Sequence, residues 1–178
     1  MEIIKTSIED LVVLRPTVLK DERGYFMESF KESFFQKHYP DLKFIQDNES
    51  KSSFGVLRGL HFQNPPFEQT KLVRVIQGEV LDVAVDLRLN SKTYGKYESV
   101  ILSGGNKKQF LIPKGFAHGF VVLSEEAIFS YKVDNDYAPD YDSGIKYNDS
   151  KLGIDWILEE GNLIISEKDM KLPGFNSL

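Results

Sequence analysis

Side chains that could take part in proton transfer or ligand binding are concentrated in four short segments of this 178-residue sequence. The segments are residues 46–63, 112–120, 131–139 and 166–169. The first is the densest and contains Arg58 and His61. A lone histidine between Leu60 and Phe62 is more often a structural residue than a base, so both interpretations of His61 stay open.

Arg58 and His61 can serve one pocket only if their strand is irregular. Side chains alternate between the two faces of a strand, so residues three apart point to opposite faces. A bulge or bend would bring both to the same side, and Gly59 is the position where the backbone deforms most easily. The sequence therefore predicts an irregularity at Gly59.

The other segments also have ordinary structural interpretations. His118 follows a glycine-containing turn and enters an apolar stretch, where it could simply bind a backbone carbonyl. Tyr131 could be a core aromatic, and Ser166 is typical of a helix N-cap that precedes a charged first turn. None of these segments is diagnostic by itself.

The chain has no cysteine and only three histidines, which are His38, His61 and His118. This excludes disulfides, cysteine-ligated zinc, iron–sulfur clusters and thiol nucleophiles. A metal site built on histidine would have few ligands to draw on. His61 also lacks a second histidine two residues later, and His38 is predicted to lie on a helix, so a facial metal triad is not expected.

The charge balance argues against nucleic-acid and membrane partners. Basic residues number 22 and acidic residues 27, which gives a formal net charge of −5. An anionic ligand would need a local basic pocket. The N-terminus carries charge where a signal peptide is apolar, and no apolar run approaches the ~18 residues of a membrane span. We expect a cytoplasmic protein.

The hydrophobic pattern predicts one mainly β domain over residues 1–178. Only residues 31–39 have helical spacing, and Pro40 ends that run. Short β-branched and aromatic runs separated by turn residues predict strands at 71–76, 80–87, 97–102, 109–112, 119–123 and 127–133. Such close spacing without intervening helices favours an antiparallel sandwich or barrel, and we expect a jelly roll.

Strand parity raises the possibility of a polar interior. Residues 80–88 place leucine and valine on one face and Asp82 and Asp86 on the other. That polar face is either solvated or lines the interior of a barrel. Lys71 and Tyr131 each share a strand face with apolar residues, and an isolated polar group in such a setting needs a partner.

Taken together, the motifs resemble those of the dTDP-4-dehydrorhamnose 3,5-epimerase family. The resemblance covers nearly the whole chain in order. It rests on residues 21–28 (DERGYFME), 46–48 (QDN), 56–63 (VLRGLHFQ), 71–75 (KLVRV), 82–86 (DVAVD), 115–120 (GFAHGF) and 166–169 (SEKD). It implies a cupin-type jelly roll with a few short helices, a homodimer, and no metal or other cofactor.

The resemblance also implies a reaction and its catalytic residues. The substrate would be dTDP-4-dehydro-6-deoxyglucose, inverted at C3 and C5 on the route to dTDP-L-rhamnose. His61 would be the base, oriented by Asp169, and Tyr131 the acid on the opposite face of the sugar. Lys71 would stabilise the enolate oxygen that forms when a carbon next to the C4 ketone loses its proton.

Further residues would bind the substrate. Arg58 and Arg23 would contact the diphosphate. By resemblance, Arg23, Phe26 and Glu28 reach the neighbouring subunit's site, and Asp82 is a partner of His118 or Lys71. Gln46, Asp47 and Asn48 are predicted to bind near the thymine base of the substrate, and Tyr137 is predicted to stack on that base. The remaining predicted substrate contacts are His118, Asp142 and Lys168.

The sequence departs from the family pattern at three places. Asp142 stands where glutamate is common, Glu49 replaces a frequent histidine, and Phe110 replaces a frequent tryptophan. Two alternatives stay open, and the first does so because a related epimerase would need the same base, acid and enolate-stabilising cation. One is an epimerase that acts at C3 only or on another nucleotide-linked 4-keto sugar; the other is a binding module without turnover. A complete set of His61, Asp169, Tyr131 and Lys71 argues against the binding module.

Overall fold

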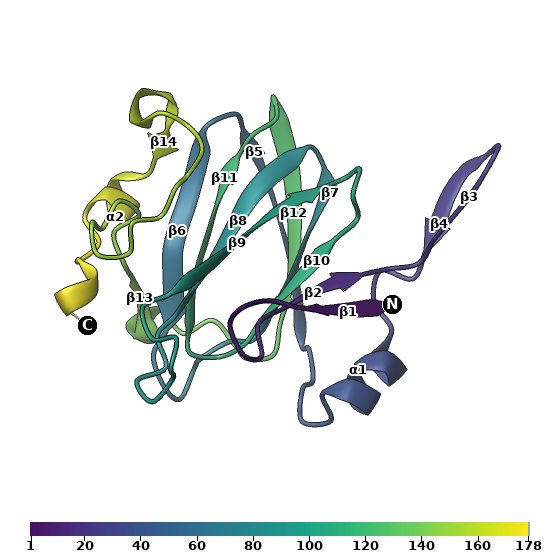
Figure 1. Cartoon of the computed structure of the whole chain (residues 1–178), viewed down its shortest axis with the longest axis horizontal. Coiled ribbons are helices and arrows are strands. Elements are labelled where there is room, and N and C mark those ends of the chain that lie inside the picture. The colour runs from purple at the N-terminus through teal and green to yellow at the C-terminus, as the bar shows by residue number, and fades with distance from the viewer. Residues whose placement is uncertain (178) are drawn as a thin grey trace.

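The computed structural model describes residues 1–177 and consists mainly of two packed sheets (Figure 1). The first sheet has the order β1 (Glu2–Lys5), β2 (Val12–Arg15), β10 (Gln109–Ile112), β7 (Lys71–Gln77), β12 (Glu126–Val133) and β5 (Gln46–Ser53). The second has the order β13 (Asp142–Gly144), β6 (Val56–Gln63), β11 (Phe116–Val122), β8 (Glu79–Asp86) and β9 (Tyr97–Ser103). All these strand pairs are antiparallel, and β14 (Ile164–Ile165) adds to β6 in parallel.

The remaining elements lie outside the two sheets. β3 (Val18–Asp21) and β4 (Gly24–Met27) form a hairpin that projects from the body (Figure 1). The helices are α1 (Glu32–His38) and α2 (Glu167–Met170), with single 3-10 turns at Pro139–Tyr141, Glu160–Asn162 and Phe175–Ser177. In residues 1–177, no helix is long and apolar enough to cross a membrane.

The mainly β jelly-roll prediction is confirmed, as is the helix predicted over residues 31–39. The predicted strand at 119–123 begins earlier, at Phe116, because residues 116–122 pair continuously with β8. His118 therefore lies inside β11 rather than at its entry. Strands β1 to β5, β13 and β14 were not among the predicted strands, because β5 is polar along its length and the others have four residues or fewer.

The core has three layers, and they show whether the face of β8 that carries Asp82 and Asp86 is solvated or buried. One cluster fills the space between the sheets and includes Val80, Ala84 and Phe129. A second lies on the other side of β8, where Leu81 and Val83 pack beneath the C-terminal segment. A third packs α1 against the first sheet. Both faces of β8 are thus buried, so its aspartates are interior groups and the solvated-face alternative is wrong.

Asp86 shows how one of these buried aspartates is stabilised. Its carboxylate accepts hydrogen bonds from the Arg88 guanidinium at 2.9 Å, the Ser91 hydroxyl at 2.6 Å and the Thr93 hydroxyl at 2.7 Å. Burial raises the pKa of Asp86, but these bonds together outweigh it and lower the pKa to about 2. The turn after β8 is therefore held by a charged acceptor.

We expect Asp86→Asn to lower the free energy of unfolding by about 2 kcal/mol at pH 7. A pKa below the ordinary value of 3.8 stabilises the folded state above about pH 4, and that contribution disappears as the pH falls toward 2. Urea unfolding at several pH values measures the difference. Glu2→Gln breaks an exposed ion pair with Arg15 and should change stability by less than about 0.5 kcal/mol. An Asp86→Asn deficit that stayed constant below pH 4 would contradict the assignment.

Candidate active site

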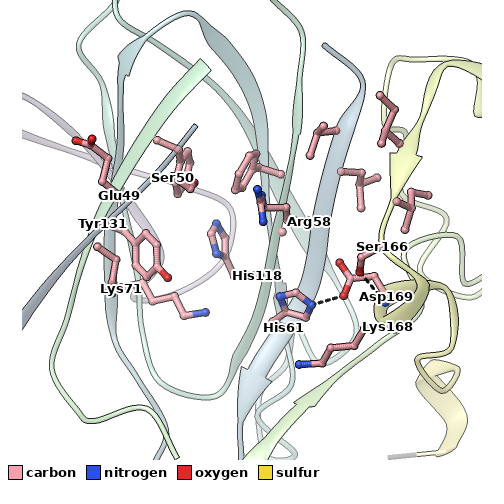
Figure 2. Close-up of a pocket in the computed structure, with 18 residues that line it drawn as sticks. Glu49, Ser50, Arg58, His61, Lys71, His118, Tyr131, Ser166, Lys168 and Asp169 are labelled. Carbon is pink, nitrogen blue, oxygen red and sulfur yellow. Dashed lines mark hydrogen bonds and ion pairs between the residues drawn. The ribbon is translucent and has the colours of Figure 1, made fainter. Parts of the chain in front are cut away.

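The interior of the jelly roll contains a cavity of about 680 Å³. Its walls come from both sheets and from the C-terminal segment, as Figure 2 shows. Part of its lining is apolar and includes Phe120, which stacks on Phe129 at a ring-centroid distance of 4.2 Å. Polar and charged side chains line the rest, so the cavity can hold a polar ligand.

The predicted irregularity at Gly59 is confirmed. The register between β6 and β11 shifts next to this residue, and both Arg58 and His61 line the cavity. Gly59 has a φ of +126°, and a Cβ there would lie 2.5 Å from the Cα of Gly119. Only glycine fits, so the close approach of β11 explains why the glycine is needed.

His61 is held by Asp169 from the far end of the chain. His61 Nε2 lies 2.8 Å from one carboxylate oxygen, and the other oxygen accepts the backbone N–H of Gly59 at 3.2 Å. Because a carboxylate only accepts hydrogen bonds, Nε2 is the protonated nitrogen and Nδ1 keeps its lone pair on the cavity side (Figure 2). In that tautomer Nδ1 is the ring nitrogen that can accept a proton from a ligand in the cavity.

Ser166 fixes the position of Asp169. Its hydroxyl accepts the backbone N–H of Asp169 at 3.1 Å, which confirms the predicted N-cap of α2. The preceding strand β14 pairs with β6, the strand that carries His61. Asp169 therefore reaches His61 across more than a hundred residues of sequence because β14 attaches the C-terminal segment to β6.

Tyr131 and Lys71 face His61 from the opposite sheet. Tyr131 lies on β12. Lys71 lies on β7, opposite Val133 of β12, so the side chains of Tyr131 and Lys71 share the inner face of the first sheet (Figure 2). Burial raises the pKa of Tyr131, although Arg58 opposes this. Burial lowers the pKa of Lys71 to about 8, against the attraction of Asp82 and Asp142. At neutral pH the phenol carries its proton and most of the amine is charged.

Asp82 and His118 form a second histidine–carboxylate pair between the sheets. His118 Nε2 lies 3.0 Å from both oxygens of Asp82. Asp82 is fully buried; burial raises its pKa, while His118 and Lys71 lower it. His118 thus binds a carboxylate rather than a backbone carbonyl, and Asp82 couples electrostatically to both residues suggested as its partners.

The predicted residues of β5 fall on two faces. Asn48 lines the cavity and accepts a hydrogen bond from Gln46 at 2.8 Å. Asp47 lies on the opposite face, where it pairs with Lys132, so the structure does not place it in the cavity. Ser52 was not predicted as part of the site. Its hydroxyl accepts hydrogen bonds from the Arg58 guanidinium at 3.1 and 3.2 Å. Ser52 is four residues after Asn48 on the same strand, so it lies on the same face, and this spacing could have indicated its role.

Asp142, Lys168 and Tyr137 lie together beside the cavity. One oxygen of Asp142 accepts from the Lys168 ammonium at 2.5 Å and from the Tyr137 hydroxyl at 3.3 Å. Lys168 lines the cavity next to Asp169 (Figure 2). Two of the predicted substrate contacts, Lys168 and Tyr137, are therefore bound to the third, Asp142.

The structure does not bring Arg23, Phe26 and Glu28 into the cavity of their own chain. They belong to the projecting β3–β4 hairpin or the residue after it, where Arg23 pairs with Asp21 and Glu28 with Lys31. Phe26 is 66% exposed. Within residues 1–177, no group of three or more histidine, aspartate or glutamate side chains is arranged to hold a metal ion.

The fold and the cavity together define a class of protein: jelly rolls whose interior cavity is lined by a histidine–carboxylate pair and a phenol. Residues 5–177 match the family model described as dTDP-4-dehydrorhamnose 3,5-epimerase. The chain belongs to this family of epimerases.

Two curated relatives and one solved structure illustrate the similarity. The chain is 57% identical over 167 residues to the dTDP-4-dehydrorhamnose 3,5-epimerase of Methanothermobacter thermautotrophicus, covering 93% of this chain and 90% of that protein. It is 53% identical over 174 residues to the Escherichia coli K12 enzyme, covering 97% and 93%. A Legionella pneumophila epimerase crystallised with dTDP-4-keto-L-rhamnose superposes with a TM-score of 0.94 at 49% identity, covering 98% of this chain and 93% of that one.

Proposed function

We propose that this protein inverts C3 and C5 of dTDP-4-dehydro-6-deoxyglucose to give dTDP-4-dehydro-L-rhamnose, a step in the biosynthesis of dTDP-L-rhamnose. The observation that carries the proposal is the placement of His61 and Tyr131 on opposite sheets, facing one cavity, with Lys71 beside Tyr131. Inversion needs a base on one face of the sugar and an acid on the other. The family relationship supports the substrate.

His61 removes the proton. A C–H bond next to the C4 ketone gives its proton to Nδ1 of His61, and the electron pair moves to form an enolate. The Asp169 carboxylate, 2.8 Å from Nε2, stabilises the imidazolium that results. The charge that develops on the ketone oxygen is stabilised by the ammonium of Lys71, inside a cavity where electrostatic interactions are strong.

Tyr131 returns a proton to the other face. The enolate carbon takes the proton of the phenol, and the ketone is regenerated with inverted configuration. Burial keeps the pKa of Tyr131 above its ordinary value, so the hydroxyl is protonated when the enolate forms. C3 and C5 both flank the C4 ketone, so the same set of groups serves both carbons once the His61 imidazolium and the Tyr131 phenolate left by the first inversion have exchanged protons with water.

Arg58 is the proposed diphosphate ligand, and Gln46 and Asn48 are proposed to contact the thymine. Arg58 lines the cavity as a guanidinium oriented by Ser52, which suits it to bidentate binding of phosphate oxygens. Gln46 orients the Asn48 amide. Tyr137 stacks on the thymine base, and His118 and Lys168 supply further contacts with the substrate.

A second copy of the chain is proposed to complete the site. The β3–β4 hairpin exposes three large apolar side chains, with 62% of Leu19, 55% of Tyr25 and 66% of Phe26 accessible. Apolar groups gathered on a projecting hairpin favour an interaction partner. In a homodimer the hairpin would place Arg23, Phe26 and Glu28 in the partner's site. The location proposed for the dimer is the cytoplasm, where the nucleotide-sugar substrate would be available.

Incubation with dTDP-4-dehydro-6-deoxyglucose in deuterated water, followed by NMR of the sugar ring, tests the function. Deuterium at both C3 and C5 is the expected result. Deuterium at C3 alone would replace the proposal with a C3 epimerase. No deuterium, with the ligand still bound, would indicate a nucleotide-sugar binding module.

We expect kcat/KM to fall above about pH 8, because the pKa of about 8 means that Lys71 loses its charge there and no longer stabilises the enolate. Each further pH unit should cost about tenfold. In Lys71→Arg the guanidinium stays charged, so the ratio of rates at pH 7 and pH 9.5 should be close to one. The same alkaline loss in Lys71→Arg would rule out Lys71 as its origin.

A further inference from the structure

We infer that Asp142 is a positioning residue that joins two substrate-binding side chains, Tyr137 and Lys168, rather than a substrate contact itself. The inference rests on the proposed function, because that function makes Tyr137 and Lys168 ligand contacts. Tyr137 comes from the loop after β12, and Lys168 comes from α2. A single carboxylate oxygen connects these two distant segments.

The burial of the three side chains supports this role. The Asp142 side chain is 16% exposed, whereas that of Lys168 is 63% exposed and Tyr137 is 57% exposed. The carboxylate therefore lies beneath the two side chains that it orients. A long exposed lysine and an exposed tyrosine lose considerable side-chain entropy when a ligand fixes them. A fixed acceptor beneath them reduces that cost before the ligand arrives.

The backbone of Asp142 is itself rigid. β13 pairs with β6 so that Asp142 lies opposite Gln63 and Gly144 lies opposite His61. A Cβ at Gly144 would come within 2.6 Å of the Leu60 carbonyl oxygen and 2.8 Å of the Leu172 side chain. The strand that carries Asp142 is thus packed tightly against the catalytic strand on one side and the C-terminal segment on the other.

Gln63 holds the backbone around Tyr137 but not its side chain. The Gln63 amide accepts the N–H of Ala138 at 2.7 Å and donates to the carbonyl of Asp136 at 3.0 Å. These bonds fix the chain on both sides of Tyr137. The hydroxyl bond to Asp142 is then what orients the ring.

The hydrogen bonds of Asp142 also favour positioning over direct contact with the ligand. One of its oxygens already accepts from both the Lys168 ammonium and the Tyr137 hydroxyl. The carboxylate also raises the pKa of Lys168, so the ammonium keeps its charge beside the cavity. Asp142 thereby orients the Lys168 ammonium and the Tyr137 ring toward the ligand, while the Lys168 charge balances that of its own carboxylate.

Calorimetric titration with dTDP tests the inference through a mutant cycle. We expect Asp142→Ala to weaken dTDP binding by about tenfold in the otherwise wild-type protein. In a Tyr137→Phe, Lys168→Met background the same substitution should weaken binding by less than about twofold, because the two side chains that it orients are already altered. An equal loss in both backgrounds would show that Asp142 contacts the ligand directly and would overturn the inference.

Two further variants separate positioning from general damage to the fold. Asp142→Glu keeps a carboxylate on a longer stem, and the flexible Lys168 can adjust to it, so the affinity should stay within about threefold of wild type. A loss equal to that of Asp142→Ala would contradict the inference. Glu167→Ala removes an exposed carboxylate 3.6 Å from the ammonium of Lys171, the residue that follows α2, and should leave dTDP affinity unchanged.

If the wild-type protein did not bind dTDP at all, the proposed function would fail. Binding with equal losses in both backgrounds would leave the function intact and refute only the role of Asp142. Thermal unfolding by circular dichroism accompanies each titration, so that the comparison uses folded variants.

Discussion

Replacing His61 with asparagine should abolish exchange of the sugar's C3 and C5 hydrogens, with a loss of at least about 10³-fold in turnover. Asparagine has similar size and can still bind Asp169, but its amide cannot accept the carbon-bound proton. Arg58 remains in place, so dTDP should still bind. Loss of exchange together with retained binding distinguishes a missing base from a collapsed pocket. The measurements are NMR in deuterated water and calorimetry.

The other two histidines provide matched controls for this prediction. His38 lies at the end of α1, outside the cavity, so His38→Asn should keep wild-type turnover. His118 lines the cavity and is paired with Asp82, so His118→Asn should cost less than His61→Asn. Exchange close to the wild-type rate in His61→Asn would remove His61 from the role of base.

Tyr131→Phe should separate proton loss from inversion. The phenylalanine ring fills the same space but has no proton to give, whereas His61 and Asp169 still form their pair. We expect deuterium to enter the substrate by return from His61 to the same face, while formation of the inverted product falls by about 10²-fold or more. NMR distinguishes deuterated starting material from inverted product.

Tyr94→Phe is the control for Tyr131→Phe, since Tyr94 does not line the cavity and should tolerate the change. Unimpaired formation of inverted product by Tyr131→Phe would exclude Tyr131 as the acid. Loss of both exchange and inversion would assign Tyr131 to an earlier step than the one proposed.

Local rules predicted several parts of the site. The alternation of side chains along a strand required an irregularity between Arg58 and His61, and the structure has it at Gly59. Ser166 caps α2 as its type and position indicated. Such features depend on a few neighbouring residues, so one sequence is enough to predict them.

Features that depend on distant segments were not predictable in the same way. Whether the β8 aspartates would be buried or solvated could not be predicted from β8 alone. The C-terminal segment covers the outer side of β8, and the cluster between the sheets covers its inner side. The pairing of His61 with Asp169 was predicted from family resemblance and not from a local pattern. It depends on β14, which attaches the C-terminal segment to β6, and a strand of two residues gives no recognisable sequence pattern. The Asp142 cluster joins three segments, and no spacing in the sequence reveals it.

A crystal structure of the His61→Asn variant with dTDP-4-dehydro-6-deoxyglucose bound tests the central claim most directly. The distances to measure join the side chain at position 61 and the Tyr131 hydroxyl to C3 and C5 of the sugar. We expect these groups on opposite faces of the ring, each within about 3.5 Å of a reacting carbon, with the Lys71 ammonium hydrogen-bonded to the C4 oxygen. Both groups on the same face, or a sugar ring outside the cavity, would contradict the mechanism.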